Sequence, residues 1–144
     1  MGVLGKTLSC AAVLLTMSLG QANAKNYYCV INKSRGGGDT SSLPPDLYVW
    51  HDETTGSVKV LDGMIQKVFE EPIGGAVSVD NTKRMTFSYT IKKVPGKNQY
   101  GGKVLASGLG YRLTIQKSDL SATLSMKPLG FANTFRGEGK CSLK

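Results

Sequence analysis

The sequence predicts an all-β protein, and it favours a single up-and-down antiparallel barrel of about eight strands over a β-sandwich. Apolar and polar residues alternate with a period of two along most of the chain after residue 24, which is typical of half-buried strands. No window after residue 24 shows the i, i+3, i+4, i+7 spacing of an amphipathic helix. Glycine and other turn residues interrupt the alternation at intervals of roughly 8 to 12 residues, the spacing found in sandwiches and barrels.

Residues 1–24 have the three-part pattern of a secretory signal peptide. Lys6 supplies the positive charge, residues 8–19 form an apolar stretch, and residues 22–24 (Ala-Asn-Ala) are a small-residue cleavage site. The apolar stretch is shorter than the about 20 residues that a transmembrane helix requires. We therefore expect a mature chain of 144 − 24 = 120 residues, folded as one domain over 25–144 and located in the periplasm or secreted.

The first half of the mature chain contains five predicted strands separated by turn residues. Apolar clusters and alternation place them near residues 27–31, 47–51, 58–60, 64–69 and 76–79. A long exposed loop is expected over 33–45, where glycine, serine and proline dominate. Asp62 and Gly63 predict a two-residue turn, because both residues accept positive φ.

The second half of the chain has the clearest alternation. It predicts strands over residues 84–92, 103–109, 111–116, 120–127 and 131–141. The pair Ser118 and Asp119 predicts a tight hairpin. Residues 95–102 are expected to form a wide hairpin tip which, like the loop over 33–45, is either a solvated connection or part of a binding site.

Two cysteines remain once Cys10 is removed with the signal, and both fall on the apolar face of a predicted strand. Cys29 shares the parity of Tyr27, and Cys141 shares the parity of Phe135. In an oxidising compartment we expect a Cys29–Cys141 disulfide, the alternative being two reduced, buried thiols. If the first and last strands are neighbours, this bond fastens the seam of the barrel.

Charge is unevenly distributed along the mature chain, which carries 18 − 1 = 17 Lys and Arg against 10 Asp and Glu, a net +7. Residues 43–80 contribute 2 − 7 = −5, and residues 81–144 contribute 12 − 2 = +10. Consecutive strands of a meander lie side by side, so we expect an acidic flank and a basic flank; the alternative reading is solubility and cross-strand pairing. The basic flank is the expected contact for an anionic envelope component or an acidic protein, with the candidate residues Lys92, Lys93, Lys97, Lys103 and Arg112.

The sequence offers little support for catalysis, a metal site or a cofactor. His51 is the single histidine, which excludes a site of several imidazoles, and a disulfide would leave no thiolate ligand. Residues 50–53 (Trp-His-Asp-Glu) are the one local cluster of titratable groups, and a hairpin explains them because adjacent strand residues point to opposite faces. We therefore predict a non-enzymatic protein without cofactor or nucleic-acid partner, and keep a hydrolase centred on His51 as a rival.

Several segments resemble small, uncharacterised secreted bacterial β-proteins. The residues that carry this resemblance are 111–115 (Tyr-Arg-Leu-Thr-Ile), 127–131 (Lys-Pro-Leu-Gly-Phe), 133–135 (Asn-Thr-Phe) and 137–141 (Gly-Glu-Gly-Lys-Cys). The resemblance covers most of the mature chain. It implies a β-fold and no known activity.

Residues 107–111 (Ser-Gly-Leu-Gly-Tyr) are similar to a short motif of the periplasmic inhibitors of C-type lysozyme, which are small disulfide-bonded barrels. This resemblance implies an inhibitory site at Ser107 and Tyr111, with Lys117 standing for the later lysine of that family. The alternative is that the two glycines relieve a bend in a strand.

The sequence thus predicts an exported binding or envelope-associated barrel with a basic contact surface. Two alternatives stay open beside it. One is a lysozyme-type inhibitor, and the other is a small-molecule carrier that uses the barrel interior with residues 36–45 as a lid.

Overall fold

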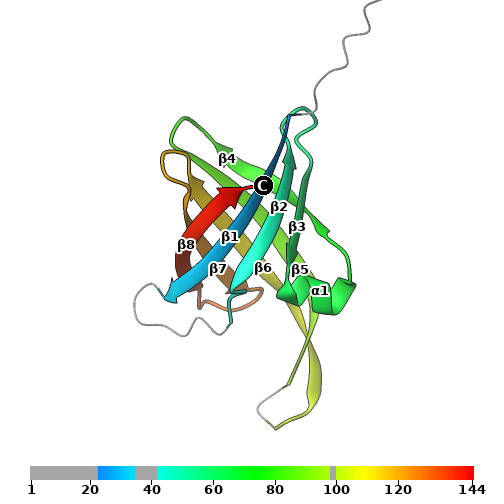
Figure 1. The fold of residues 1–144 in the computed structure, drawn as a ribbon. Coiled ribbons are helices and arrows are strands. Elements are labelled where there is room, and N and C mark those ends of the chain that lie inside the picture. The colour runs from blue at the N-terminus through cyan, green and yellow to red at the C-terminus, as the bar shows by residue number, and fades with distance from the viewer. Residues whose placement is uncertain (1–22, 35–41, 98–99) are drawn as a thin grey trace, which may run out of the picture.

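The computed structural model describes residues 23–34, 42–97 and 100–144, which form eight strands and one short helix (Figure 1). The strands are β1 (Ala24–Ser34), β2 (Asp46–Asp52), β3 (Val58–Asp62), β4 (Ile73–Asp80), β5 (Arg84–Lys97), β6 (Lys103–Gln116), β7 (Ser121–Pro128) and β8 (Phe135–Leu143). The helix, α1 (Gly63–Phe69), connects β3 to β4. The all-β class predicted from the alternation of apolar and polar residues is confirmed.

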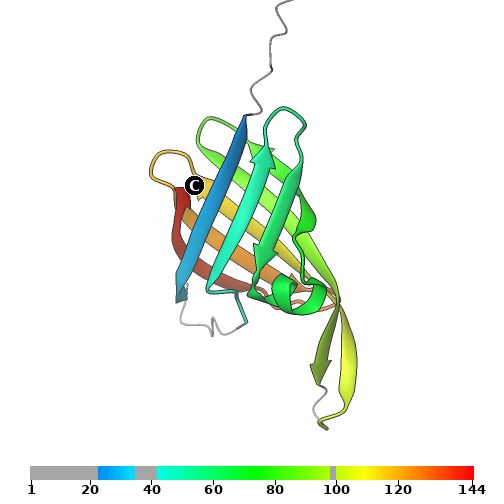
Figure 2. The same cartoon turned by 45° about the vertical axis from the view of Figure 1, so that its right-hand side comes forward.

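The eight strands form one closed antiparallel barrel in which each strand pairs with the next along the chain. β1 also pairs with β8, which closes the barrel. Figure 2 shows the tilted strands wrapped around a common axis. The up-and-down barrel is therefore confirmed over the sandwich alternative, and closure pairs the two edges that an open sheet would leave exposed.

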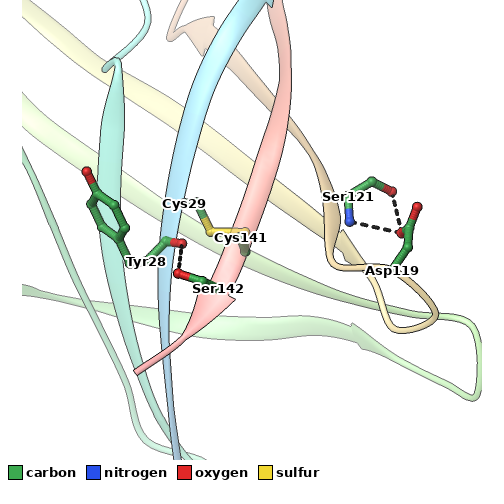
Figure 3. Close-up of a disulfide and its surroundings, with 6 residues drawn as sticks. All are labelled: Tyr28, Cys29, Asp119, Ser121, Cys141 and Ser142. Atoms are coloured by element: carbon green, nitrogen blue, oxygen red, sulfur yellow. Dashed lines mark hydrogen bonds between the residues drawn. A yellow bond between two sulfur atoms is a disulfide. The ribbon is translucent and has the colours of Figure 1, made fainter.

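The seam between β1 and β8 carries the predicted disulfide. Cys29 and Cys141 are direct cross-strand partners with a Cα–Cα distance of 3.9 Å, and their sulfurs are bonded (Figure 3). Both cysteines are buried, with 0% and 4% of their surface exposed, so the inward orientation expected from parity is confirmed. The bond therefore joins the first and last strands on the inside of the barrel.

Aromatic and aliphatic side chains form the described core. Phe87 is fully buried, and its ring centroid lies 5.8 Å from that of Tyr27 and 5.4 Å from that of His51. Tyr89 and Tyr111 stack in parallel on neighbouring strands, with centroids 4.8 Å apart. Burial of this apolar surface is the main stabilising contribution to the barrel.

Segment 64–69 was predicted to be a strand after a turn at Asp62 and Gly63, and both predictions are wrong. Asp62 is the N-cap of α1, and its carboxylate accepts a hydrogen bond from the Ile65 amide at 2.8 Å. Ile65 is fully buried in the core, and Glu70 ends the helix in the left-handed conformation with φ of 64°. A capped first turn and one buried apolar residue thus stabilise a short helix where the sequence suggested a hairpin.

Two further boundaries differ from the prediction. The strands expected over 103–109 and 111–116 are one continuous strand, β6, because β5 is equally long and pairs with it throughout. β8 begins at Phe135, so the strand predicted over 131–141 begins too early, and Phe131 lies in the preceding turn. Most of the loop predicted over 33–45 lies outside the described residues.

The connections leave the barrel at two opposite ends. One end carries the turns after β2, β4 and β6, together with the start of β1 and the end of β8. The other end carries α1, the β5–β6 hairpin and the β7–β8 connection. We call it the ribbon end, because β5 and β6 extend there beyond the barrel as a two-stranded ribbon (Figure 1; Figure 2).

The acidic residues of segment 43–80 lie at strand ends and in connections. They are Asp46, Asp52, Glu53, Asp62, Glu70, Glu71 and Asp80. Away from the ribbon end, Glu53 pairs with Lys25 at 2.7 Å, and Asp80 pairs with Lys117 at 2.6 Å. The expected acidic flank is thus a set of charges in turns, and some of them are neutralised by neighbouring lysines.

Candidate functional site

The ribbon brings four of the five candidate basic residues together. Its cross-strand pairs run from Lys92↔Gly108 to Lys97↔Lys103, so two of the lysines face each other directly near the tip. The four side chains are exposed, and no carboxylate pairs with them within the part of the chain that the structure describes. We define the lysine ribbon as Lys92, Lys93, Lys97 and Lys103.

Arg112, the fifth candidate, lies apart from the lysine ribbon. It is exposed on the barrel wall, where its neighbours across the sheet are Ser88 on β5 and Ser125 on β7. It lies four positions after Gly108 on β6, which corresponds to about 13 Å along a strand. The five candidate residues thus lie at two separate sites. The ribbon, with four lysines, has the higher density of positive charge.

The ribbon leaves the barrel at a bend made by Lys93 and Gly108. Lys93 has φ of 56°, and Gly108, beside it on the paired strand, has φ of 155°, a conformation that residues with a side chain rarely adopt. A Cβ on Gly108 would lie 2.9 Å from the carbonyl oxygen of Ile91 and 3.0 Å from a methyl carbon of Leu129. Glycine is therefore required here, and the strand bend proposed from the sequence is present.

The β7–β8 connection packs onto this bend. The Leu129 amide donates a hydrogen bond to the Gly108 carbonyl at 2.9 Å, and the Phe131 amide donates one to the Pro128 carbonyl at 3.2 Å. Two apolar side chains project from the turn, with 42% of Leu129 and 64% of Phe131 exposed. We call residues 128–131 the apolar turn; Lys127, also exposed, directly precedes it.

Pro128 and Phe131 of the apolar turn help to line a groove of about 400 Å³. Its lining is mostly apolar, with Ser42 and Asn133 as polar members beside Met64, Leu109, Met126, Pro128, Phe131 and Phe135. The residues come from α1, β6, β7, β8 and the connections between them. The ribbon end therefore combines an apolar recess, an exposed apolar turn and a cluster of lysines.

The residues of the lysozyme-inhibitor motif are not brought together. Ser107 is exposed on the ribbon next to the bend, whereas Tyr111 is buried in the barrel against Tyr89. Burial raises the pKa of the Tyr111 hydroxyl far above its ordinary value of 10.0. Lys117 lies at the opposite end of the barrel, where it pairs with Asp80.

Besides tyrosines, the described core contains two buried titratable groups, Asp62 and His51. Asp62 accepts hydrogen bonds from the Ile65 amide at 2.8 Å and from the Tyr89 hydroxyl at 3.1 Å. Burial nevertheless raises the pKa of the Asp62 carboxyl, because transfer out of water disfavours its charged form. His51 packs edge-on against Phe87, and its Nδ1 has no hydrogen-bond partner among the described atoms. These groups face the core and serve packing and helix capping.

The cluster at residues 50–53 is the entry to the hairpin between β2 and β3, as the sequence predicts. Asp52 accepts hydrogen bonds from the amides of Thr54 and Thr55, which lowers the pKa of its carboxyl, and Glu53 pairs with Lys25. Within the described ranges, no three His, Cys, Asp or Glu side chains come together as metal ligands. Over the same ranges, the chain has no helix with the length and hydropathy needed to cross a bilayer.

Comparisons of this chain with protein-family models, with curated proteins and with solved structures found no match. The candidate site must therefore be judged on its own geometry. Sequence reasoning found the four lysines but missed the apolar turn and the groove. The sequence signal for the turn was the run Leu129-Gly130-Phe131. Its central glycine interrupts the alternation of apolar and polar residues and is typical of a turn.

Proposed function

We propose that this protein is an exported, non-enzymatic binding module whose lysine ribbon contacts an anionic partner. The observation that carries the proposal is the placement of Lys92, Lys93, Lys97 and Lys103 on one protruding hairpin without carboxylate partners in the described part of the chain. Like charges directly across a strand pair are unfavourable, so the pair Lys97↔Lys103 does not serve stability. An anion bound between them would remove this repulsion.

Electrostatic reach supports the same conclusion. The mature chain expected after removal of residues 1–24 carries a formal net charge of +7, and the ribbon holds four of its positive charges away from the neutralising pairs at the other end. A protruding cluster of one sign raises the local concentration of oppositely charged partners and accelerates their association.

Export is the second part of the proposal. The disulfide between Cys29 and Cys141 is buried at the barrel seam, and such structural bonds persist in oxidising compartments. Residues 1–24 supply the signal-peptide pattern, and most of them lie outside the described residues. We therefore propose action in the periplasm or outside the cell, where anionic envelope components and acidic proteins are both available.

The test is a charge reversal with a matched control. In the first variant Lys92→Glu is combined with Lys93→Glu on the ribbon; in the control Lys59→Glu is combined with Lys83→Glu, at exposed positions outside the ribbon. Both variants change the net charge equally. Binding of the purified oxidised protein to polyglutamate, to dextran sulfate and to anionic lipid vesicles is measured at several salt concentrations.

We expect the ribbon variant to bind at least one of these probes on the order of tenfold more weakly than the control, and added salt to weaken wild-type binding. Equal loss in both variants would show that net charge alone drives binding. Absence of binding to all three probes would equally remove the proposal.

A further inference from the structure

We propose that the anionic partner is a lipid surface, which the ribbon end docks onto by inserting the apolar turn among the acyl chains. The lysine ribbon and Lys127 then lie along the anionic head groups. This inference rests on the proposed function, since it names the partner of the same lysines. It adds an apolar contact that polyanions such as acidic polypeptides and sulfated sugars would not need.

The distribution of exposed apolar residues points to this end of the barrel. Eight large hydrophobic side chains are exposed among the described residues, and five of them belong to the ribbon end: Met64, Phe69, Tyr100, Leu129 and Phe131. They come from three separate connections, namely α1, the ribbon and the apolar turn. Exposed apolar side chains gathered at one end and accompanied by lysines are the pattern of proteins that bind in the membrane interface.

The charged and the apolar parts are joined into one unit at Gly108. The Leu129 side chain occupies the space that a side chain on Gly108 would need, and its amide donates to the Gly108 carbonyl. Gly108 pairs with Lys92 across the ribbon, and Lys127 lies two residues before Leu129. The apolar turn is thus fixed beside two lysines, so both parts can reach one surface together.

Among the described residues, Asp46, Glu70 and Glu71 are carboxylates of this end. Asp46 accepts a hydrogen bond from the Tyr28 hydroxyl at 3.0 Å on the barrel wall, and Glu70 and Glu71 directly follow α1. The three lie outside the ribbon and the apolar turn. Phe131 also lines the mostly apolar groove at this end.

The experiment uses vesicles of phosphatidylcholine with and without an equal amount of phosphatidylglycerol, and it measures cosedimentation of the oxidised full protein. Phe131→Ser is compared with Leu143→Ser, which removes a side chain of similar exposure, 55% against 64%, at the opposite end of the barrel. Unchanged thermal midpoints verify that both variants fold. We expect Phe131→Ser to weaken binding to anionic vesicles about tenfold or more, and Leu143→Ser to leave it within about twofold.

Penetration is measured separately with lipids brominated on their acyl chains. Trp50, the single tryptophan, lies on the barrel wall and serves as the internal reference in the wild-type protein. Phe131→Trp places a second fluorophore in the apolar turn. We expect bromine to quench the emission that this substitution adds and to leave Trp50 unquenched.

The outcomes separate the two proposals. Vesicle binding that needs the lysine ribbon but is equal in Phe131→Ser and Leu143→Ser overturns docking by insertion and leaves the proposed function standing. The same holds if polyglutamate or dextran sulfate bind through the ribbon while anionic vesicles do not. If neither the vesicles nor the two polyanions bind through the lysine ribbon, both the proposed function and docking by insertion are overturned.

Discussion

Gly139 on β8 faces the carbonyl oxygen of Val30 on β1, and a Cβ on Gly139 would overlap that oxygen. The Val30 carbonyl belongs to the main chain and cannot turn away as a side chain could. It lies next to the irregularity between Ile31 and Lys33, where the register of β1 and β8 shifts. The seam of the barrel therefore depends on a glycine two residues from Cys141.

Gly139→Ala should lower the free energy of unfolding by about 1–3 kcal/mol, because the seam must move to accept the methyl group. Gly74→Ala on β4 is the control, since nothing lies within 4 Å of a Cβ there. Its effect should stay within about 0.5 kcal/mol. Urea titration followed by circular dichroism measures both, and equal stability of the two variants would contradict the close approach.

Removal of the disulfide should lower the free energy of unfolding by about 2–5 kcal/mol, because the bond closes a long loop in the unfolded chain. The variant combines Cys29→Ala with Cys141→Ala, and the wild-type protein with a reducing agent provides an independent comparison. Both should show the same shift in the urea midpoint relative to the oxidised protein. A midpoint that does not change on reduction would mean that the bond contributes nothing.

Asp62 should make stability depend on pH in a definite direction. Burial raises the pKa of its carboxyl above the ordinary 3.8, so the folded state binds this proton more tightly than the unfolded state. The stabilisation is complete below the ordinary pKa and is lost as the pH rises through the raised one. Asp62→Asn keeps a capping side chain but removes the titration.

We therefore expect the stability of Asp62→Asn, relative to that of the wild-type protein, to improve as the pH rises from about 3.8 towards neutrality. Urea unfolding at a series of pH values measures this difference. A constant difference across the range would show that the carboxyl has the same pKa in both states.

Gly108→Ala should displace the apolar turn from the bend of the ribbon. The new Cβ would lie 3.0 Å from the Leu129 methyl carbon and 2.9 Å from the Ile91 carbonyl oxygen. Gly110→Ala is the control, because its nearest atoms lie at 3.6 and 3.8 Å, an ordinary contact. We expect Gly108→Ala alone to speed hydrogen exchange at the Leu129 amide and to lower the free energy of unfolding by about 1–3 kcal/mol. Equal exchange in both variants would count against the packing at the bend.

Strand alternation was sufficient to predict the barrel, because a half-buried strand must alternate and consecutive short connections leave few topologies. It failed at α1, where Asp62 was interpreted as a turn residue. An aspartate suits a hairpin and a helix cap equally well, and the buried contact of Ile65 that decides between them is tertiary. Gly108 and Gly110 suggested a break in β6, but the pairing with β5 holds the strand continuous.

The lysines of the ribbon could be identified from sequence because the residue type alone gives the charge. Their separation from Arg112 could not, since the point at which β5 and β6 leave the barrel depends on the bend at Lys93 and Gly108. Phe131 was predicted to begin the last strand, and its exposure follows only from the turn that precedes β8.

The two bonded sulfurs are 112 residues apart, one near each extremity of the folded chain. Cys29 belongs to the first strand of the barrel to be synthesised, and its partner Cys141 belongs to β8. A chain without β8 has an unbonded Cys29 thiol and unpaired edges on β1 and β7. The bond between Cys29 and Cys141 can therefore form only in a chain that already contains β8, so an oxidised pair distinguishes chains able to close the barrel from shorter ones.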